Sequence, residues 1–218
     1  MEAVARRKAH WLLRSGSENT FIGKRRPQED MVTSAVFGSI LLLCPEERRG
    51  ALAILLGKNC WDTVKGEFGA DIDIDLWPRD YRDGTTGPEP DVILGKGSAK
   101  VIVEVKWHAP LSDRQLELQI EAVGIQNVTA IFMLGEAGVG EEILGRPCFR
   151  RTWRDVSEDL QNWLRCRREG ARTPMVRWVT TMQAFLQETD MGRIFNGLPL
   201  QEPVGAVCFD FSKPDHAP

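Results

Sequence analysis

The sequence has no long hydrophobic run and no paired cysteine motif. Its 218 residues are 42% hydrophobic, yet the longest apolar stretch, residues 39–43, is far too short to cross a bilayer. The start, MEAVARRKAH, lacks the apolar segment of a secretory signal peptide. Five cysteines are scattered without a Cys-x-x-Cys pair, which argues against a disulfide framework and a structural zinc site. We therefore expect a soluble, cytoplasmic protein that makes no membrane contact.

A strong basic excess is also missing. The formal net charge is −3 at pH 7, whereas many nucleic-acid binders are markedly basic. Charge is nevertheless uneven, because arginines are concentrated in residues 146–177, a basic triplet occupies residues 24–26, and acids crowd residues 67–91. An acidic centre with basic flanks is typical of metal-assisted chemistry on a polyanion, and equally of solvated helix faces. The candidate phosphate contacts are Arg150, Arg151, Arg154, Lys24 and Arg25.

Periodicity and chain breakers predict an α/β protein. Helices are expected at residues 29–43, 45–56, 113–123, 156–166 and 174–186. Strands are expected at residues 72–76, 91–94, 100–107 and 128–134, with a weaker one at 204–211. The first three strands form a meander, and the helix before the fourth implies a parallel crossover onto the same sheet.

The third predicted strand ends in charged residues. In Val101-Ile102-Val103-Glu104-Val105-Lys106, alternate residues share a face, so Glu104 and Lys106 point the same way as Ile102. Taken alone, this pair is most simply interpreted as a weak ion pair where a strand emerges into solvent.

The surrounding residues resemble a known signature. Pro90-Asp91, twelve residues, and then Glu104-Val105-Lys106 is similar to the motif of the PD-(D/E)xK phosphodiesterase superfamily. The resemblance extends over residues 29–134 and implies a restriction-endonuclease-like core, a central mixed sheet flanked by helices. It also implies that Asp91 and Glu104 ligate a divalent metal, that the carbonyl of Val105 adds a ligand, and that Lys106 orients or activates the attacking water.

The resemblance divides the chain into three parts of one domain. Residues 1–28 form a basic segment, residues 29–135 the nuclease core, and residues 136–218 an Arg-rich helical part. The chemistry agrees, because a metal can both neutralise phosphoryl oxygens and supply hydroxide at neutral pH. Mg²⁺ needs few carboxylates, and Mn²⁺ can substitute for it.

The predicted activity is therefore hydrolysis of nucleic acid, DNA rather than RNA, by endonuclease or exonuclease cleavage. The alternative is a nuclease-fold binding module with little or no turnover, which acts in a protein or nucleic-acid complex. A protein partner or a homodimer is compatible with both predictions.

Two further residues are candidates for the same site. Glu29 lies on the helix stripe of Val36 and Ile40, whereas Asp30 is turned about a quarter of the way round. Glu29 is therefore either an additional active-site acid or a carboxylate that complements the helix dipole. Gln119, on the helix after Lys106, either lines the site or lies at an exposed helix edge.

Overall fold

The computed structural model describes most of the chain between residues 29 and 188. The described ranges are 29–69, 71–78, 88–95, 97–106, 111–112, 114–135, 141–166 and 173–188. Lys24, Arg25 and the predicted strand at 204–211 lie outside the described residues.

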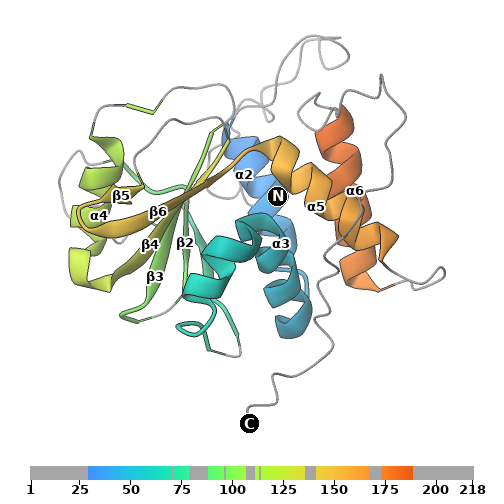
Figure 1. Cartoon of the computed structure of the whole chain (residues 1–218), viewed down its shortest axis with the longest axis horizontal. Helices are drawn as coiled ribbons and strands as arrows, with labels where there is room; N and C mark the ends of the chain where they lie inside the picture. The colour runs from blue at the N-terminus through green and yellow to red at the C-terminus, as the bar shows by residue number, and fades with distance from the viewer. Residues whose placement is uncertain are drawn as a thin grey trace, which may run out of the picture.

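A six-stranded mixed sheet lies at the centre of the fold (Figure 1), in the order β1-β2-β3-β4-β6-β5. Its strands are β1 (Ile74–Leu76), β2 (Val92–Leu94), β3 (Lys100–Val105), β4 (Val128–Leu134), β5 (Glu142–Ile143) and β6 (Arg146–Arg151). The first three strands are antiparallel neighbours, and β4 and β6 continue the sheet in parallel with β3. The predicted meander and parallel crossover strand are confirmed.

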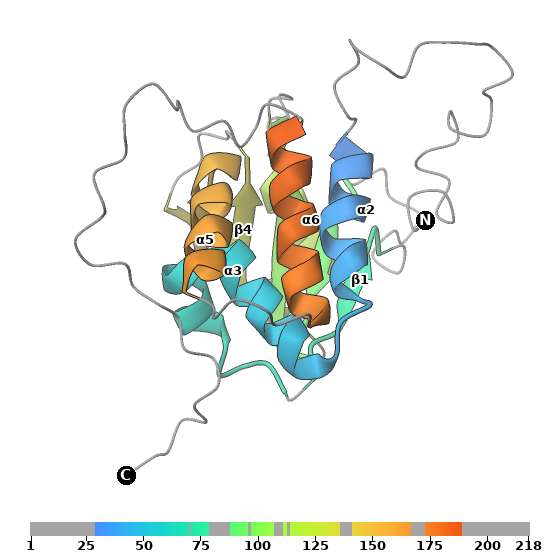
Figure 2. The same ribbon diagram turned by 90° about the vertical axis from the view of Figure 1, so that its right-hand side faces the viewer.

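Helices cover both faces of this sheet unequally. Helix α4 (Gln115–Val123), followed by the short η3 (Ile125–Asn127), is the one α-helix of the described ranges that covers the first face. The other face carries α2 (Glu29–Ile40), α3 (Pro45–Val64), α5 (Trp153–Arg165) and α6 (Pro174–Glu188). In the perpendicular view, α5, α6 and α2 stand side by side in front of the sheet (Figure 2). The sheet therefore separates two apolar clusters, a large one under the four helices and a small one under α4.

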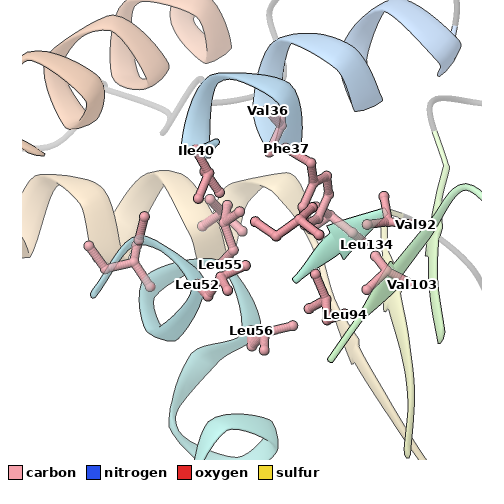
Figure 3. Close-up of a cluster of buried hydrophobic side chains, with 14 of the residues drawn as sticks. Val36, Phe37, Ile40, Leu52, Leu55, Leu56, Val92, Leu94, Val103 and Leu134 are labelled. Atoms are coloured by element: carbon pink, nitrogen blue, oxygen red, sulfur yellow. The ribbon is translucent and has the colours of Figure 1, made fainter. Parts of the chain in front are cut away.

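Alternation along β3 directs its side chains into these two clusters. Val101, Val103 and Val105 belong to the large cluster, whereas Ile102 belongs to the small one. Figure 3 shows the large cluster, where apolar side chains of α2 and α3 project toward the strands. The labelled residues are Val36, Phe37, Ile40, Leu52, Leu55, Leu56, Val92, Leu94, Val103 and Leu134. Burial of this layer leaves the opposite face of β3 for Glu104.

Strands β5 and β6 correct the prediction that the chain is helical beyond residue 135. Within Arg146–Arg151, three arginines and Pro147 obscure any alternation, and Cys148 alone is buried. A strand near the edge of a sheet needs little apolar surface, so its sequence gives a weak periodic signal. The predicted helical character is confirmed for α5 and α6.

Helix α3 is interrupted at Gly57, and Arg151 binds backbone carbonyls just before the interruption. Gly57 has φ 72° and ψ 166°, which interrupts the helical hydrogen bonds. The Nη1 atom of Arg151 donates to the carbonyl oxygens of Ile54 at 2.5 Å and Leu55 at 3.2 Å. Its Nη2 atom lies 2.6 Å from Oδ2 of Asp159 on α5. Arg151 therefore joins β6 to α3 and α5, a structural role that the sequence did not predict.

We expect Arg151→Ala to lower the free energy of unfolding by about 2–4 kcal/mol, because it leaves two carbonyls and a carboxylate without their charged donor. Arg154→Ala is the matched control, since the exposed Arg154 pairs with Glu158 across one helical turn at 3.0 Å. Its loss should cost no more than about 0.5 kcal/mol. Urea denaturation measures both, and equal effects would contradict the structural role of Arg151.

Candidate active site

Asp91, Glu104 and Lys106 meet where β2 begins and β3 ends. The antiparallel register pairs Val92 with Val103, which brings Asp91 beside the end of β3. Oδ2 of Asp91 accepts a hydrogen bond from the backbone N–H of Val105 at 2.8 Å. The three members of the sequence signature are therefore brought together by the ladder between two neighbouring strands.

Glu104 and Lys106 form a buried pair. Glu104 is 2% exposed and Lys106 is 6% exposed, and Lys106 Nζ lies 2.8 Å from Glu104 Oε1. Gln115 Nε2 also donates to Oε1, while Gln119 Nε2 donates to Oε2 at 2.9 Å. Both carboxylate oxygens thus have partners from α4. The interpretation of the pair as a solvent-exposed strand end is wrong, and so is an exposed helix edge for fully buried Gln119.

The pKa of the Asp91 carboxyl is shifted by its surroundings. Burial raises the pKa of the Asp91 carboxyl well above its usual value, and the nearby negative charge of Glu104 raises it further. The Val105 N–H and the Lys106 ammonium group act in the opposite direction, and the charge of Asp30 adds a smaller increase to the pKa. A cation between the Asp91 and Glu104 carboxylates would relieve the repulsion between them, whereas the Lys106 ammonium group beside Glu104 acts against it.

Asp30 is the acid of α2 that the structure relates to this site. We expected it to be turned about a quarter of the way round from the stripe that faces the sheet, but it is half-buried and its charge acts on Asp91. Asp30 lies about 20° from Phe37 on the helix, and Phe37 points toward the sheet in Figure 3. Glu29 begins the helix, but its side chain lies outside the described residues. The buried stripe of α2 includes Phe37 as well as Val36 and Ile40, so it extends to the side of the helix that carries Asp30.

The donor set fits a hard divalent cation. Asp91, just before β2, bonds the Val105 N–H next to Glu104, and the charge of Glu104 acts on it. Gln119 Oε1 is buried without a hydrogen-bond partner among the described residues. Within the described part of the chain, no three His, Cys, Asp or Glu side chains are grouped to hold a metal. Mg²⁺ suits such a site, because it accepts one or two carboxylates and keeps several waters.

The three predicted arginine contacts differ in their relation to this cluster. The parallel register aligns Glu104 with Met133 and Met133 with Arg150, so exposed Arg150 shares a row and a sheet face with Glu104. Two strand spacings separate them, which is about 10 Å. Arg151 points to the opposite face and is engaged in the fold. Arg154 is exposed and pairs with Glu158.

Similarity to known proteins does not assign the site. Comparisons with protein-family models, curated proteins and solved structures find no significant match. None of the described helices combines the length and the apolar composition needed to cross a membrane. The chemistry must therefore be inferred from the geometry of the cluster itself.

The raised pKa of Asp91 predicts a pH dependence of stability without metal. Because the folded state raises this pKa, it binds more protons than the unfolded state above about pH 4. The wild type should therefore lose stability relative to Asp91→Asn as the pH rises from about 4 toward neutrality. Urea denaturation in the presence of a chelator measures the difference. Parallel pH profiles of the two proteins would contradict the raised pKa.

Proposed function

We propose that the protein is a metal-dependent nuclease that hydrolyses phosphodiester bonds of nucleic acid. The observation that carries the proposal is the burial of Glu104 and Lys106 as a pair beside Asp91. Burying ions costs several kcal/mol each, to the order of magnitude, and well-packed apolar residues serve stability equally well. A buried carboxylate with a raised pKa next to such a pair is typical of functional sites.

The topology supports the same proposal. A meander of β1, β2 and β3 is followed by α4 and the parallel strand β4. Asp91 immediately precedes β2, Glu104 lies near the end of β3, and Lys106 follows the last residue of β3. This order is what a restriction-endonuclease-like core requires, so we propose that fold family for the chain.

Each residue of the cluster has a role in the proposed hydrolysis. Asp91 and Glu104 would hold Mg²⁺ or Mn²⁺, with the Val105 carbonyl as a further ligand. The bound cation would supply hydroxide at neutral pH and neutralise charge on the phosphoryl oxygens. Gln115 and Gln119 fix the orientation of the Glu104 carboxylate. Lys106 directs its ammonium group to the same point, where it can orient the attacking water or a phosphoryl oxygen.

Arg150 is the residue best placed to contact a neighbouring phosphate. It is exposed and lies on the sheet face of Glu104, whereas Arg151 points away from it. Arginine suits this contact because its planar donors match phosphate oxygens.

One observation favours a binding module without turnover. Both oxygens of Glu104 already have hydrogen-bond or ion-pair partners, so this carboxylate is satisfied without a metal. On that account the buried charges serve the specificity of folding. The two functions differ in whether a divalent ion displaces these partners.

Substitutions of the three signature residues should differ in their effects on metal affinity and on cleavage. Asp91→Ala and Glu104→Ala should each weaken Mn²⁺ binding and abolish cleavage, because few protein ligands remain. Lys106→Ala should abolish cleavage and still bind Mn²⁺. Calorimetric titration measures affinity, and single- and double-stranded DNA and RNA with and without Mg²⁺ or Mn²⁺ measure cleavage.

The control for these variants is Asp62→Ala, an exposed acid on α3 that pairs with Lys58 and Lys65. It should leave both measurements unchanged. Wild-type Mn²⁺ affinity in both acid variants of the signature would end the proposal of a metal site.

Salt dependence tests the phosphate contact of Arg150. In metal-free protein, Arg150→Ala should reduce the slope of log affinity against log salt by about 1, because one counterion-releasing contact is lost. Arg154→Ala is the matched control and should change the slope less, since Glu158 already neutralises Arg154. The same slope in wild type and Arg150→Ala would remove Arg150 from the contact surface.

A further inference from the structure

The main chain of Lys106 is held from two sides just beyond the end of β3. Its N–H donates to the carbonyl of Leu134, the last residue of β4, at 2.6 Å. Its carbonyl accepts a hydrogen bond from the indole Nε1 of Trp153 at 2.9 Å. Trp153 is the first residue of α5 and is 2% exposed, so this bond lies in the interior. Lys106 lies beyond the last residue of β3, yet hydrogen bonds hold both its backbone N–H and its carbonyl.

Gly135 allows the close approach that completes this arrangement. It has φ +126°, and a Cβ at this position would lie 2.2 Å from the Lys106 carbonyl oxygen. Its N–H donates to the carbonyl of Arg151 at 2.8 Å. The ends of β4 and β6 therefore converge with the start of α5 around one carbonyl group.

The start of α5 is itself rigidly defined. Thr152 Oγ1 accepts a hydrogen bond from the Asp155 N–H at 3.1 Å, and Asp155 Oδ2 accepts one from the Thr152 N–H at 2.8 Å. This capping box fixes the first turn and hence the Trp153 backbone. A buried carbonyl without a donor is costly, so Trp153 determines where the Lys106 carbonyl can lie.

We propose that Trp153 is a positioning residue for Lys106. The orientation of the Lys106 side chain depends on its own backbone, and the indole N–H fixes that backbone from the face of the sheet opposite Glu104. The inference rests on the proposed function, in which Lys106 must align with a water or a phosphate. A displacement of about 1 Å can lower a rate by roughly a hundredfold.

Trp153→Phe removes the N–H and keeps an aromatic ring. We expect kcat to fall roughly tenfold to a hundredfold, while KM and Mn²⁺ affinity change by less than about twofold. Trp178→Phe is the matched control, because buried Trp178 loses an equivalent bond, from its Nε1 to Ser39 Oγ at 2.9 Å, away from the cluster. It should retain the wild-type kcat. Equal kcat in wild type and Trp153→Phe would overturn the proposal.

A second measurement is independent of activity. Amide hydrogen exchange in the metal-free protein should accelerate at Lys106 and Gly135 in Trp153→Phe and not in Trp178→Phe. Unchanged exchange at both amides would overturn the positioning of Lys106 by Trp153. If the wild type cleaves no substrate, the nuclease proposal fails, and locally faster exchange would still support the positioning role.

A second replacement of Trp153 removes the N–H and preserves the packing of the ring system. Site-specific replacement of Trp153 by benzothienylalanine retains the bicyclic shape and places sulfur where the N–H was. The same loss of kcat and the same faster exchange are expected. Wild-type values of both in this protein would overturn the proposal.

Discussion

The burial of Glu104 and Lys106 at the end of β3 is the constraint on which the site and its surroundings depend. Two charged groups removed from water are tolerated only when their atoms find partners. Helix α4 supplies Gln115 and Gln119, and α5 supplies Trp153 to the Lys106 backbone. The Glu104 carboxylate therefore constrains α4, and the Lys106 backbone carbonyl constrains α5 on the opposite face of the sheet. An error in either helix would leave a buried polar group unsatisfied.

The two faces of β3 have different surroundings. One face contributes Val101, Val103 and Val105 to the large apolar cluster beneath α2, α3, α5 and α6. The other carries Glu104, and among the described residues α4 and a small apolar cluster cover it. The larger cluster can therefore stabilise the fold while the smaller side accommodates charge. The same division separates Arg150, which shares the face of Glu104, from Arg151, which holds the broken helix α3.

The sequence predicted those features whose signal is local. Period-two alternation located β1, and short apolar runs bounded by turns and loops located β2, β3 and β4. The signature spacing identified Asp91, Glu104 and Lys106 as neighbours. Strand β6 was not predicted, because a largely polar strand shows no alternation of apolar residues. The relation of Asp30 to the site was not predicted either, because the buried stripe of α2 is wider than the two residues that defined it. The contacts of Arg151 with α3 and of Trp153 with Lys106 join residues 97 and 47 positions apart. Such pairings are set by tertiary packing, which no short motif encodes.

The proposed hydrolysis requires a divalent ion to enter the carboxylate cluster. Crystals of the protein soaked in Mn²⁺ and measured at a wavelength where manganese scatters anomalously would locate the ion directly. The account predicts an anomalous peak bonded to Asp91 and Glu104, with at least one of the Glu104 partners, Gln115 or Lys106, withdrawn from the carboxylate. No peak at saturating Mn²⁺, with Glu104 still bound by both glutamines and by Lys106, would contradict it.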